Sequence, residues 1–138
     1  MVLAIYYFKN ITMHSINENK ELGSFIQRSI GSFTALDIVL HYARQPNSKE
    51  TPKSISKLLG KSQDEISCCL EQFVEHKILQ RIKKKGENWY LPSPDTKKAE
   101  ILKLIKQCLD DKDKRIKLLS TALAAIREQK LGKKRKTT

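Results

Sequence analysis

The stretch from Ser62 to Leu79, SQDEISCCLEQFVEHKIL, constrains the fold of this chain more than any other segment. Ser62 is a favourable N-cap for a helix, and Glu65 follows three residues later, as the S-x-x-E capping box requires. The apolar residues that follow recur at helical spacing and share one face: Ile66, Leu70, Phe73, Val74 and Ile78. The pattern predicts an amphipathic helix over residues 62–79, whose opposite face is left to contact another molecule.

The flanking segments predict a short helix before this one and a hairpin after it. Thr51 is a suitable N-cap, Pro52 suits the first helical position, and Gly60 is a typical helix end. Downstream, LQRIKKKGENWYLPSP carries three consecutive lysines before Gly86, the residue best able to adopt the positive φ of a tight turn. A short helix, a glycine turn, a longer helix and a basic hairpin are together typical of a winged helix-turn-helix.

The segment TPKSISKLLGKSQDEISCCLEQFVEHKILQRIKKKGENWYL resembles the core of winged-helix transcriptional regulators of the MarR and ArsR kind. The resemblance covers roughly Phe33 to Leu91 and lies in the pattern of residue types. It implies a mainly α fold with a small β-hairpin, in which residues 25–95 form a winged helix-turn-helix domain. It further implies that helix 62–79 enters the major groove of double-stranded DNA, while the basic wing, residues 81–90, lies on phosphates.

The same resemblance implies which side chains contact DNA. In the related regulators the first turns of the matching helix face the groove, and here these turns carry Ser62, Gln63, Asp64, Ser67, Cys68 and Gln72. Gln63 is suited to reading adenine, and Arg81 is the second candidate for base readout. Phosphate contacts are expected from the lysines of the short helix, its turn and the wing: Lys53, Lys57, Lys61, Lys83, Lys84 and Lys85.

The charge of the predicted recognition helix departs from the family pattern. Cys68 stands where a basic residue is common, and between Ser62 and His76 there are four acidic residues and no Lys or Arg. Two other functions therefore stay open. In one, the chain is a winged-helix interaction module whose acidic helix docks on a basic protein. In the other, it is a non-specific chromosome-associated protein that binds DNA through its basic C-terminal tail.

Residues 96–131 predict a helical dimerisation segment. Its apolar residues step by three, four or seven: Leu102, Ile105, Leu109, Ile116, Leu119, Leu123 and Ile126. The heptad phase continues across the acidic patch around Asp111 and favours one long helix, although an aspartate N-cap there would divide it into two. The apolar stripe needs a partner, which is either the chain's own domain or, as we expect, a second copy in a coiled-coil homodimer.

The positive charge is concentrated near the C-terminus. The chain has a net charge of +12, which favours a polyanionic partner such as nucleic acid. Residues 1–95 carry 13 basic and 10 acidic side chains, whereas residues 96–138 carry 14 and 5. The last residues, 132–138, predict a disordered basic tail that adds sequence-independent phosphate contacts.

The N-terminal extension, residues 1–24, predicts a β-prone run at Val2–Phe8 followed by a polar loop, with Met13 as an alternative start. The apolar run after Met1 is only seven residues long, which is too short to span a membrane, and it lacks the features of a signal peptide. Three cysteines, two of them adjacent, suit a reducing cytosol. We therefore expect no membrane partner and a cytoplasmic, nucleoid-associated location.

Several expectations concern the support of the helix pair. Thr34 and Asp37 match a capping box, with Phe33 and Ile38 as its hydrophobic staple, and predict a supporting helix that ends before Pro46. Three apolar residues of the short helix are expected to pack on the longer one: Ile55, Leu58 and Leu59. Trp89 is expected to be a core anchor rather than a wedge in DNA, because large aromatic side chains bury so much area.

No residue pattern predicts catalysis, a cofactor or a metal. The sequence has no Gly-rich phosphate loop and no nucleophile with a base nearby, so we expect no enzyme. Cys68 and Cys69 invite a metal-sensor hypothesis, because ArsR-like sensors place thiolates in this helix. Adjacent helical side chains point about 100° apart, however, and would need a third ligand such as Cys108 or His76. Structural thiols are the expected state, and no small-molecule effector is identified.

Overall fold

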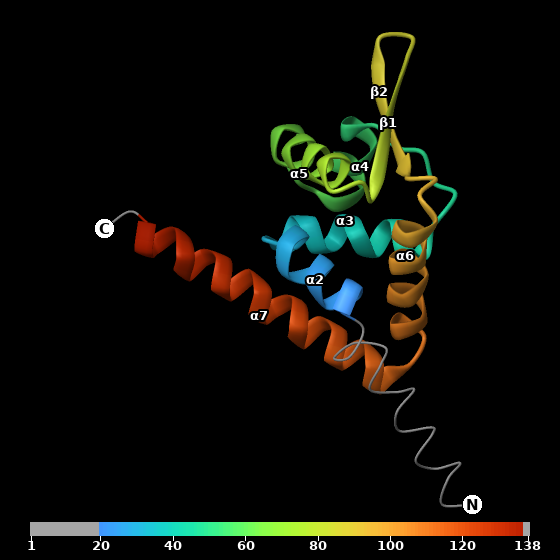
Figure 1. Ribbon diagram of the computed structural model, residues 1–138. Coiled ribbons are helices and arrows are strands. Elements are labelled where there is room, and N and C mark those ends of the chain that lie inside the picture. The colour runs from blue at the N-terminus through green and yellow to red at the C-terminus, as the bar shows by residue number, and fades with distance from the viewer. Residues whose placement is uncertain (1–19, 137–138) are drawn as a thin grey trace, which may run out of the picture.

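A computed structural model describes the backbone of residues 20–136 and the side chains of residues 20–131. The N-terminal run at Val2–Phe8 and the alternative start at Met13 lie outside these residues. The described elements follow in the order α2 (Lys20–Ser29), α3 (Phe33–Arg44), α4 (Pro52–Leu59), α5 (Gln63–Glu75), β1 (Leu79–Lys84), β2 (Glu87–Pro92), α6 (Thr96–Leu109) and α7 (Lys112–Lys136) (Figure 1). The mainly helical fold with a small antiparallel hairpin is confirmed.

Helix α3 lies at the centre of the molecule. Helix α5 packs on it from one side with α4 alongside, whereas α6 packs on it near the other end (Figure 1). Helix α2 lies between α3 and the long α7, which also contacts α6 (Figure 1). One continuous apolar core joins these helices and includes Ile26, Ile38, Ile55, Leu70, Ile105 and Ala122, all of them buried. No described helix has both the length and the apolar composition needed to cross a membrane.

Helix α3 begins earlier than its predicted capping box. Ser32 is the N-cap, and its hydroxyl oxygen accepts a hydrogen bond from the Ala35 N–H at 3.1 Å. Phe33 is therefore the first helical residue, and its side chain is exposed instead of stapling the helix start. The Thr34 hydroxyl is used elsewhere, because it donates to Glu65 Oε1 of α5 at 2.6 Å. Similarly, α2 begins at Lys20, inside the segment that was expected to be a loop.

Helix α5 begins as predicted and ends earlier. The Ser62 hydroxyl accepts from the Glu65 N–H at 3.2 Å, which confirms the N-cap. The helix ends at Glu75, because Lys77 adopts a φ of 64° and its N–H donates to the Val74 carbonyl, while the Ile78 N–H donates to the Phe73 carbonyl. These two hydrogen bonds form a Schellman motif. The predicted end at residue 79 is therefore wrong, and Leu79 starts β1.

The hairpin closes through a two-residue turn. Lys84 pairs with Glu87, and the intervening Lys85 and Gly86 both have positive φ, at 55° and 80°. Positive φ at both central positions is what a type I′ turn requires, and this turn matches the twist of the strands. Gly86 is therefore needed at its position, and the turn lies at the end of the hairpin that projects from the body of the protein (Figure 1).

The core anchor of the hairpin is Tyr90, not Trp89. Successive strand residues point to opposite faces, so only one of two adjacent aromatic side chains can enter the core. Tyr90 is buried, and its backbone forms an isolated antiparallel bridge with Glu50 through two N–H···O hydrogen bonds of 3.0 and 2.7 Å. Its carbonyl also accepts from the Tyr42 hydroxyl at 2.8 Å. Trp89 lies on the other face, where it is only half-buried.

Helix α4 packs on α5 through a narrower face than expected. Ile55 is fully buried and Leu59 is partly buried against the core, whereas Leu58 is 58% exposed. The expectation that Leu58 packs on α5 is therefore wrong. A helix of two turns offers only one side to its neighbour, and Leu58 lies about 60° around the axis from Ile55 in one direction, whereas Leu59 lies about 40° from it in the other. The chain keeps Ile55 inside and leaves Leu58 in solvent.

The C-terminal segment forms two helices. The first ends at Leu109, and Asp111 caps the second, its Oδ1 accepting from the N–H groups of Asp113 and Lys114 at 3.0 and 3.2 Å. Since short polar side chains are strong N-caps, the acidic patch ends one helix and starts another. Helix α7 then continues to Lys136, beyond residue 132, where the tail was expected to begin. The continuous long helix favoured by the heptad phase is not formed.

The predicted dimerisation stripe is consequently divided. Leu102, Ile105 and Leu109 of α6 are buried in the chain's own core, and so is Ile126 of α7. The buried face of α7 is shifted from the predicted one and consists of Leu118, Ala122, Ala125 and Ile126. Ile116 and Leu123 are 54% and 46% exposed, and Leu119 is half-buried. The assignment of Leu102, Ile105, Leu109 and Ile126 to a surface for a second copy is therefore wrong.

Candidate nucleic-acid interface

Local hydrogen bonds position α4 and α5 relative to one another. Thr51 and Ser54 form a reciprocal capping box at the start of α4, with N–H···O distances of 2.9 and 3.1 Å. Gly60 ends α4 in the left-handed conformation, with a φ of 68°, and α5 starts three residues later. The two helices pack against each other, and the exposed Lys53, Lys57 and Lys61 lie on α4 and in this turn.

One face of α5 is left open to solvent. Of the six residues implied to face a groove, Ser62, Gln63, Asp64, Cys68 and Gln72 are exposed, and Ser67 is half-buried. Asp64, Cys68 and Gln72 are spaced by four residues and therefore lie in one row along the helix. Helix α7 packs on α2 and α6, away from α5 (Figure 1). The side chain of Gln63 is thus exposed, and among the described residues the main contacts of α7 are with α6 and α2.

Two of the four acidic side chains of α5 are engaged within the fold. Glu65 accepts the hydrogen bond from Thr34, and Glu71 forms an ion pair with Arg81 of β1. Asp64 and Glu75 remain exposed. This ion pair makes Arg81 less available for base readout, because its guanidinium would have to leave the Glu71 carboxylate before it could contact a base. Gln63 is consequently the better of the two candidates for base readout.

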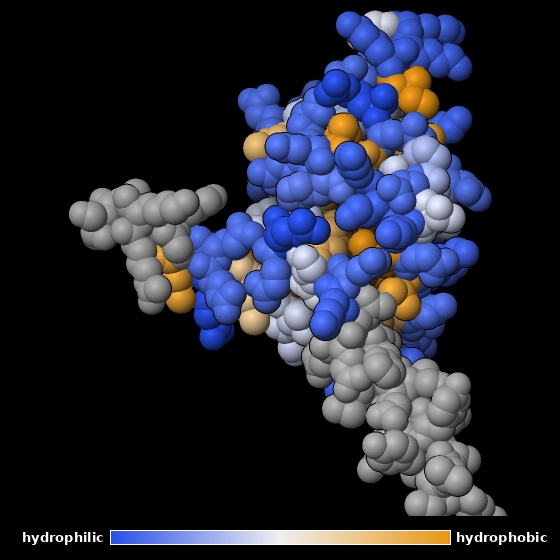
Figure 2. All heavy atoms as spheres, viewed as in Figure 1, coloured by the Kyte–Doolittle hydropathy of each residue, from blue (hydrophilic) through white to orange (hydrophobic). Residues whose placement is uncertain are grey.

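The lysines expected to contact phosphates form two groups. Lys53, Lys57 and Lys61 are exposed on and after α4, and Lys83, Lys84 and Lys85 are exposed at the end of the hairpin. Figure 2 shows hydrophilic surface covering this projecting end. Lys83 and Lys84 are consecutive strand residues and point to opposite faces of the hairpin. The wing therefore carries positive charge on both faces as well as at its turn.

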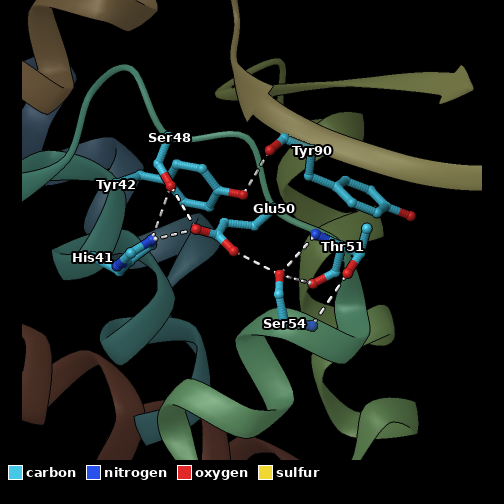
Figure 3. A network of polar contacts seen from close by, with 7 residues as sticks. All are labelled: His41, Tyr42, Ser48, Glu50, Thr51, Ser54 and Tyr90. Carbon is cyan, nitrogen blue, oxygen red and sulfur yellow. Dashed lines mark hydrogen bonds and ion pairs between the residues drawn. The ribbon is translucent and has the colours of Figure 1, made fainter.

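A polar network fixes the hairpin against the helices, and the sequence patterns did not predict it (Figure 3). Glu50 is its centre. Its Oε1 accepts from the Ser48 hydroxyl at 2.7 Å and lies 3.6 Å from His41 Nε2, while its Oε2 accepts from the Ser54 hydroxyl at 2.5 Å. The Glu50 backbone holds the Tyr90 bridge described above. One residue thus links α3, the start of α4 and β2, which sets the angle between the wing and α5.

The charge of Glu50 contributes to stability in a pH-dependent way. Burial raises the pKa of this carboxyl, but the hydrogen bonds from Ser54 and Ser48 and the nearby His41 lower it by more, so the net pKa lies below its ordinary value. A carboxylate with a lowered pKa stabilises the fold above its unfolded pKa of about 4.3, and this contribution is lost as pH falls through the folded pKa.

Glu50→Gln is expected to lower the free energy of unfolding by about 1–2 kcal/mol at pH 7, because hydrogen bonds to a charged group are replaced by weaker ones. Urea unfolding at pH 7 and at pH 3 measures the effect. The difference between the two proteins should shrink at pH 3. A difference that is the same at both pH values would contradict the role assigned to the carboxylate.

The cysteines do not converge. Cys68 is exposed on α5, whereas Cys69 and Cys108 are buried, and burial raises the pKa of the Cys69 thiol. Ser29 Oγ lies 2.7 Å from His76 Nδ1, so that ring nitrogen already has a partner. Among the described residues, no three His, Cys, Asp or Glu side chains are grouped so that they could hold a metal ion.

Comparison with known proteins adds no family to these observations: no protein-family model, curated protein or solved structure matches this chain.

Proposed function

We propose that this protein is a DNA-binding transcriptional regulator of the winged-helix kind. In this proposal α5 enters the major groove, and the hairpin, the wing of residues 81–90, lies on the phosphates. The observation that carries it is the position of an open α5 face beside a projecting hairpin that ends in Lys83, Lys84 and Lys85. A polyanion is the partner that this arrangement of charge favours.

The connectivity supports the winged-helix assignment. From α3 to β2 the chain forms a helix, a bridging residue, two helices joined by a glycine turn, and a hairpin. The bridge from Glu50 to Tyr90 pairs the segment before α4 with the outer strand of the hairpin. This pairing holds the outer edge of β2 and restrains the angle between the wing and the helix that precedes it.

The side chains favour strong phosphate contact and weak base readout. Six exposed lysines lie on the elements that precede and follow α5. Each neutralised phosphate contributes about −0.9 to the slope of log affinity against log salt concentration, so all six together would give a slope of about −5. A bidentate contact to a base contributes about 1–3 kcal/mol of discrimination. With Arg81 held by Glu71, Gln63 would supply most of it.

Duplex binding over a salt series tests the proposal. Fluorescence anisotropy of a labelled random-sequence duplex of about 20 base pairs should show tight binding at 50 mM salt and a steep loss of affinity by 200 mM. Selection of bound sequences from a random duplex pool should then give a short, weak consensus. If no duplex is retained even at low salt, the protein is not a DNA-binding regulator.

A second candidate function is a protein-interaction module, and the exposed carboxylates of Asp64 and Glu75 favour it. The substitution Asp64→Lys distinguishes the two functions. It should raise duplex affinity about tenfold if α5 approaches phosphates, because it replaces repulsion by an added contact. If α5 instead docks on a basic protein, the wild-type chain should bind no duplex. A chromosome-associated protein acting through residues 132–138 would lose its binding when that segment is deleted.

We also propose that two copies associate through the part of α7 that the core leaves exposed. Ile116 and Leu123 are seven residues apart, with the half-buried Leu119 between them, and this spacing allows two α7 helices to pack along one another. Light scattering should give about twice the 15.9 kDa chain mass, and Leu123→Asp should return it to the mass of one chain. A wild-type mass of one chain would contradict the association. Leu123 is a better position for this test than Leu119, because Leu119 packs partly against the core and its replacement would also disturb the fold.

A further inference from the structure

The hairpin has a second feature besides its lysines, which is an apolar face that points away from the core. The strand register pairs Ile82 with Trp89 and Gln80 with Leu91. Paired residues of two strands lie on the same face, and so do residues two apart in one strand, so these four side chains share one face of the hairpin. Ile82 is 43% exposed, and Trp89 and Leu91 are half-buried. Figure 2 shows apolar surface on the hairpin just below its hydrophilic end.

This face forms the floor of an open groove. The groove has a volume of about 550 Å³ and is lined by Ile82, Trp89 and Leu91 together with Lys49, Lys84, Lys85 and Glu87. Lys49 comes from the loop before α4, so the basic side chains reach the groove from two separate segments. Three lysines against one glutamate give the groove a net positive charge around an indole ring.

We propose that this groove binds an unpaired base of a single-stranded nucleic acid, stacked on Trp89, with the neighbouring phosphates held by Lys49, Lys84 and Lys85. A basic groove with an aromatic floor is the combination by which proteins bind single strands, because every base offers a π-face and every linkage a negative charge. The bases inside a duplex are already stacked on one another and offer no such face. An acidic or apolar protein segment would use either the lysines or the indole, whereas a nucleotide uses both.

The inference goes beyond the proposed function, because it concerns the face of the wing opposite Tyr90 and does not require α5 to enter the major groove of DNA. Tyr90, on the inward side, anchors the wing, and Trp89, on the outward side, is available to a ligand. The same hairpin would then contact duplex phosphates near its turn and accept a base where strands separate.

Trp89 is the only tryptophan of the chain, so its fluorescence reports on this groove alone. Titration of the full chain with an oligothymidylate of about 12 nucleotides should quench that fluorescence saturably, because thymine stacks on the indole. A strand of the same length whose central nucleotides lack bases keeps the phosphates and should bind about 5- to 150-fold more weakly, with little quenching.

Two variants complete the test. Trp89→Ala should lose affinity for the labelled oligothymidylate by about the same 5- to 150-fold, and Trp89→Phe should retain most of it because the ring is kept. Circular dichroism measures whether each variant is folded. If one of them is not, the quenching experiment on the wild-type chain still tests the proposal. Equal affinity for the normal and the base-free strands, or no quenching, would overturn the proposal. If the fluorescence is also quenched when the protein is concentrated without any nucleic acid, a second copy of the protein occupies the groove, and this result would overturn the proposal too.

Discussion

Replacing Phe73 by alanine is expected to lower the free energy of unfolding by about 3–5 kcal/mol, which is a large share of the stability of a domain of this size. Phe73 is 1% exposed, on the inner face of α5, and its ring lies 6.3 Å from that of Phe25 in α2. The substitution would remove the side chain that joins the candidate recognition helix to the helices beneath it. The cavity would remain, because neighbouring helices cannot close it completely.

Urea unfolding followed by far-ultraviolet circular dichroism measures this change. Leu58→Ala is the matched control, because it removes a large apolar side chain from α4, where that side chain is mostly in solvent. Its effect should stay within about 0.5 kcal/mol. Equal effects for the two substitutions would contradict the packing of α4 and α5 described above.

Replacing Lys83, Lys84 and Lys85 together by alanine is expected to make DNA binding much less dependent on salt. If each lysine neutralises one phosphate, the log–log slope should become less steep by about 2.7, and affinity at 0.1 M salt should fall on the order of 10²-fold. The loss should be similar for all duplex sequences, because phosphate contacts carry no sequence information. Anisotropy titrations at several salt concentrations measure both quantities.

The control for the wing variant removes the same charge from another place. Lys106, Lys112 and Lys117 are exposed near the junction of α6 and α7, at the far end of the molecule from the hairpin turn (Figure 1). Replacing these three by alanine should change the slope by less than about 1, because long-range charge is largely screened at this salt concentration. If both triple variants weaken binding equally, the wing has no special role.

Local features of the fold were predictable where short-range chemistry decides them. Ser62 caps α5 and Thr51 caps α4, since each hydroxyl needs only the N–H three residues ahead. Gly60 and Gly86 were identified because few other residues adopt positive φ without strain. These positions depend on two to four neighbouring residues, which a sequence displays directly.

Features that depend on distant partners were not predictable in the same way. Trp89 and Tyr90 are adjacent aromatic residues, and the strand alternation alone does not say which of them faces inward. The bridge from Tyr90 to Glu50, forty residues earlier, decides it. Likewise, Thr34 and Ser32 are both possible caps, and Thr34 is instead used by Glu65 of another helix.

The C-terminal stripe illustrates a different difficulty. A heptad pattern fixes the face of a helix only if the helix is continuous, and the cap at Asp111 interrupts it. After the interruption, α7 presents Ala122 and Ala125 to the core, where small side chains allow close contact between helices. The predicted face was defined by large apolar residues, and alanine is not one of them. The buried face of α7 therefore differs from the predicted one by about one position.

The most direct test of the central claim, that the open face of α5 lies against duplex DNA, uses Cys68. It is the exposed one of the three cysteines, since Cys69 and Cys108 are buried, so a thiol-reactive photo-cross-linker attaches to α5. The matched control is Cys68→Ser combined with Ser120→Cys, which moves the label to an exposed position on α7. Irradiation with a labelled duplex should give cross-links from Cys68 and few from position 120. Cross-links from position 120 without any from Cys68, or retention of no duplex at all, would contradict the claim.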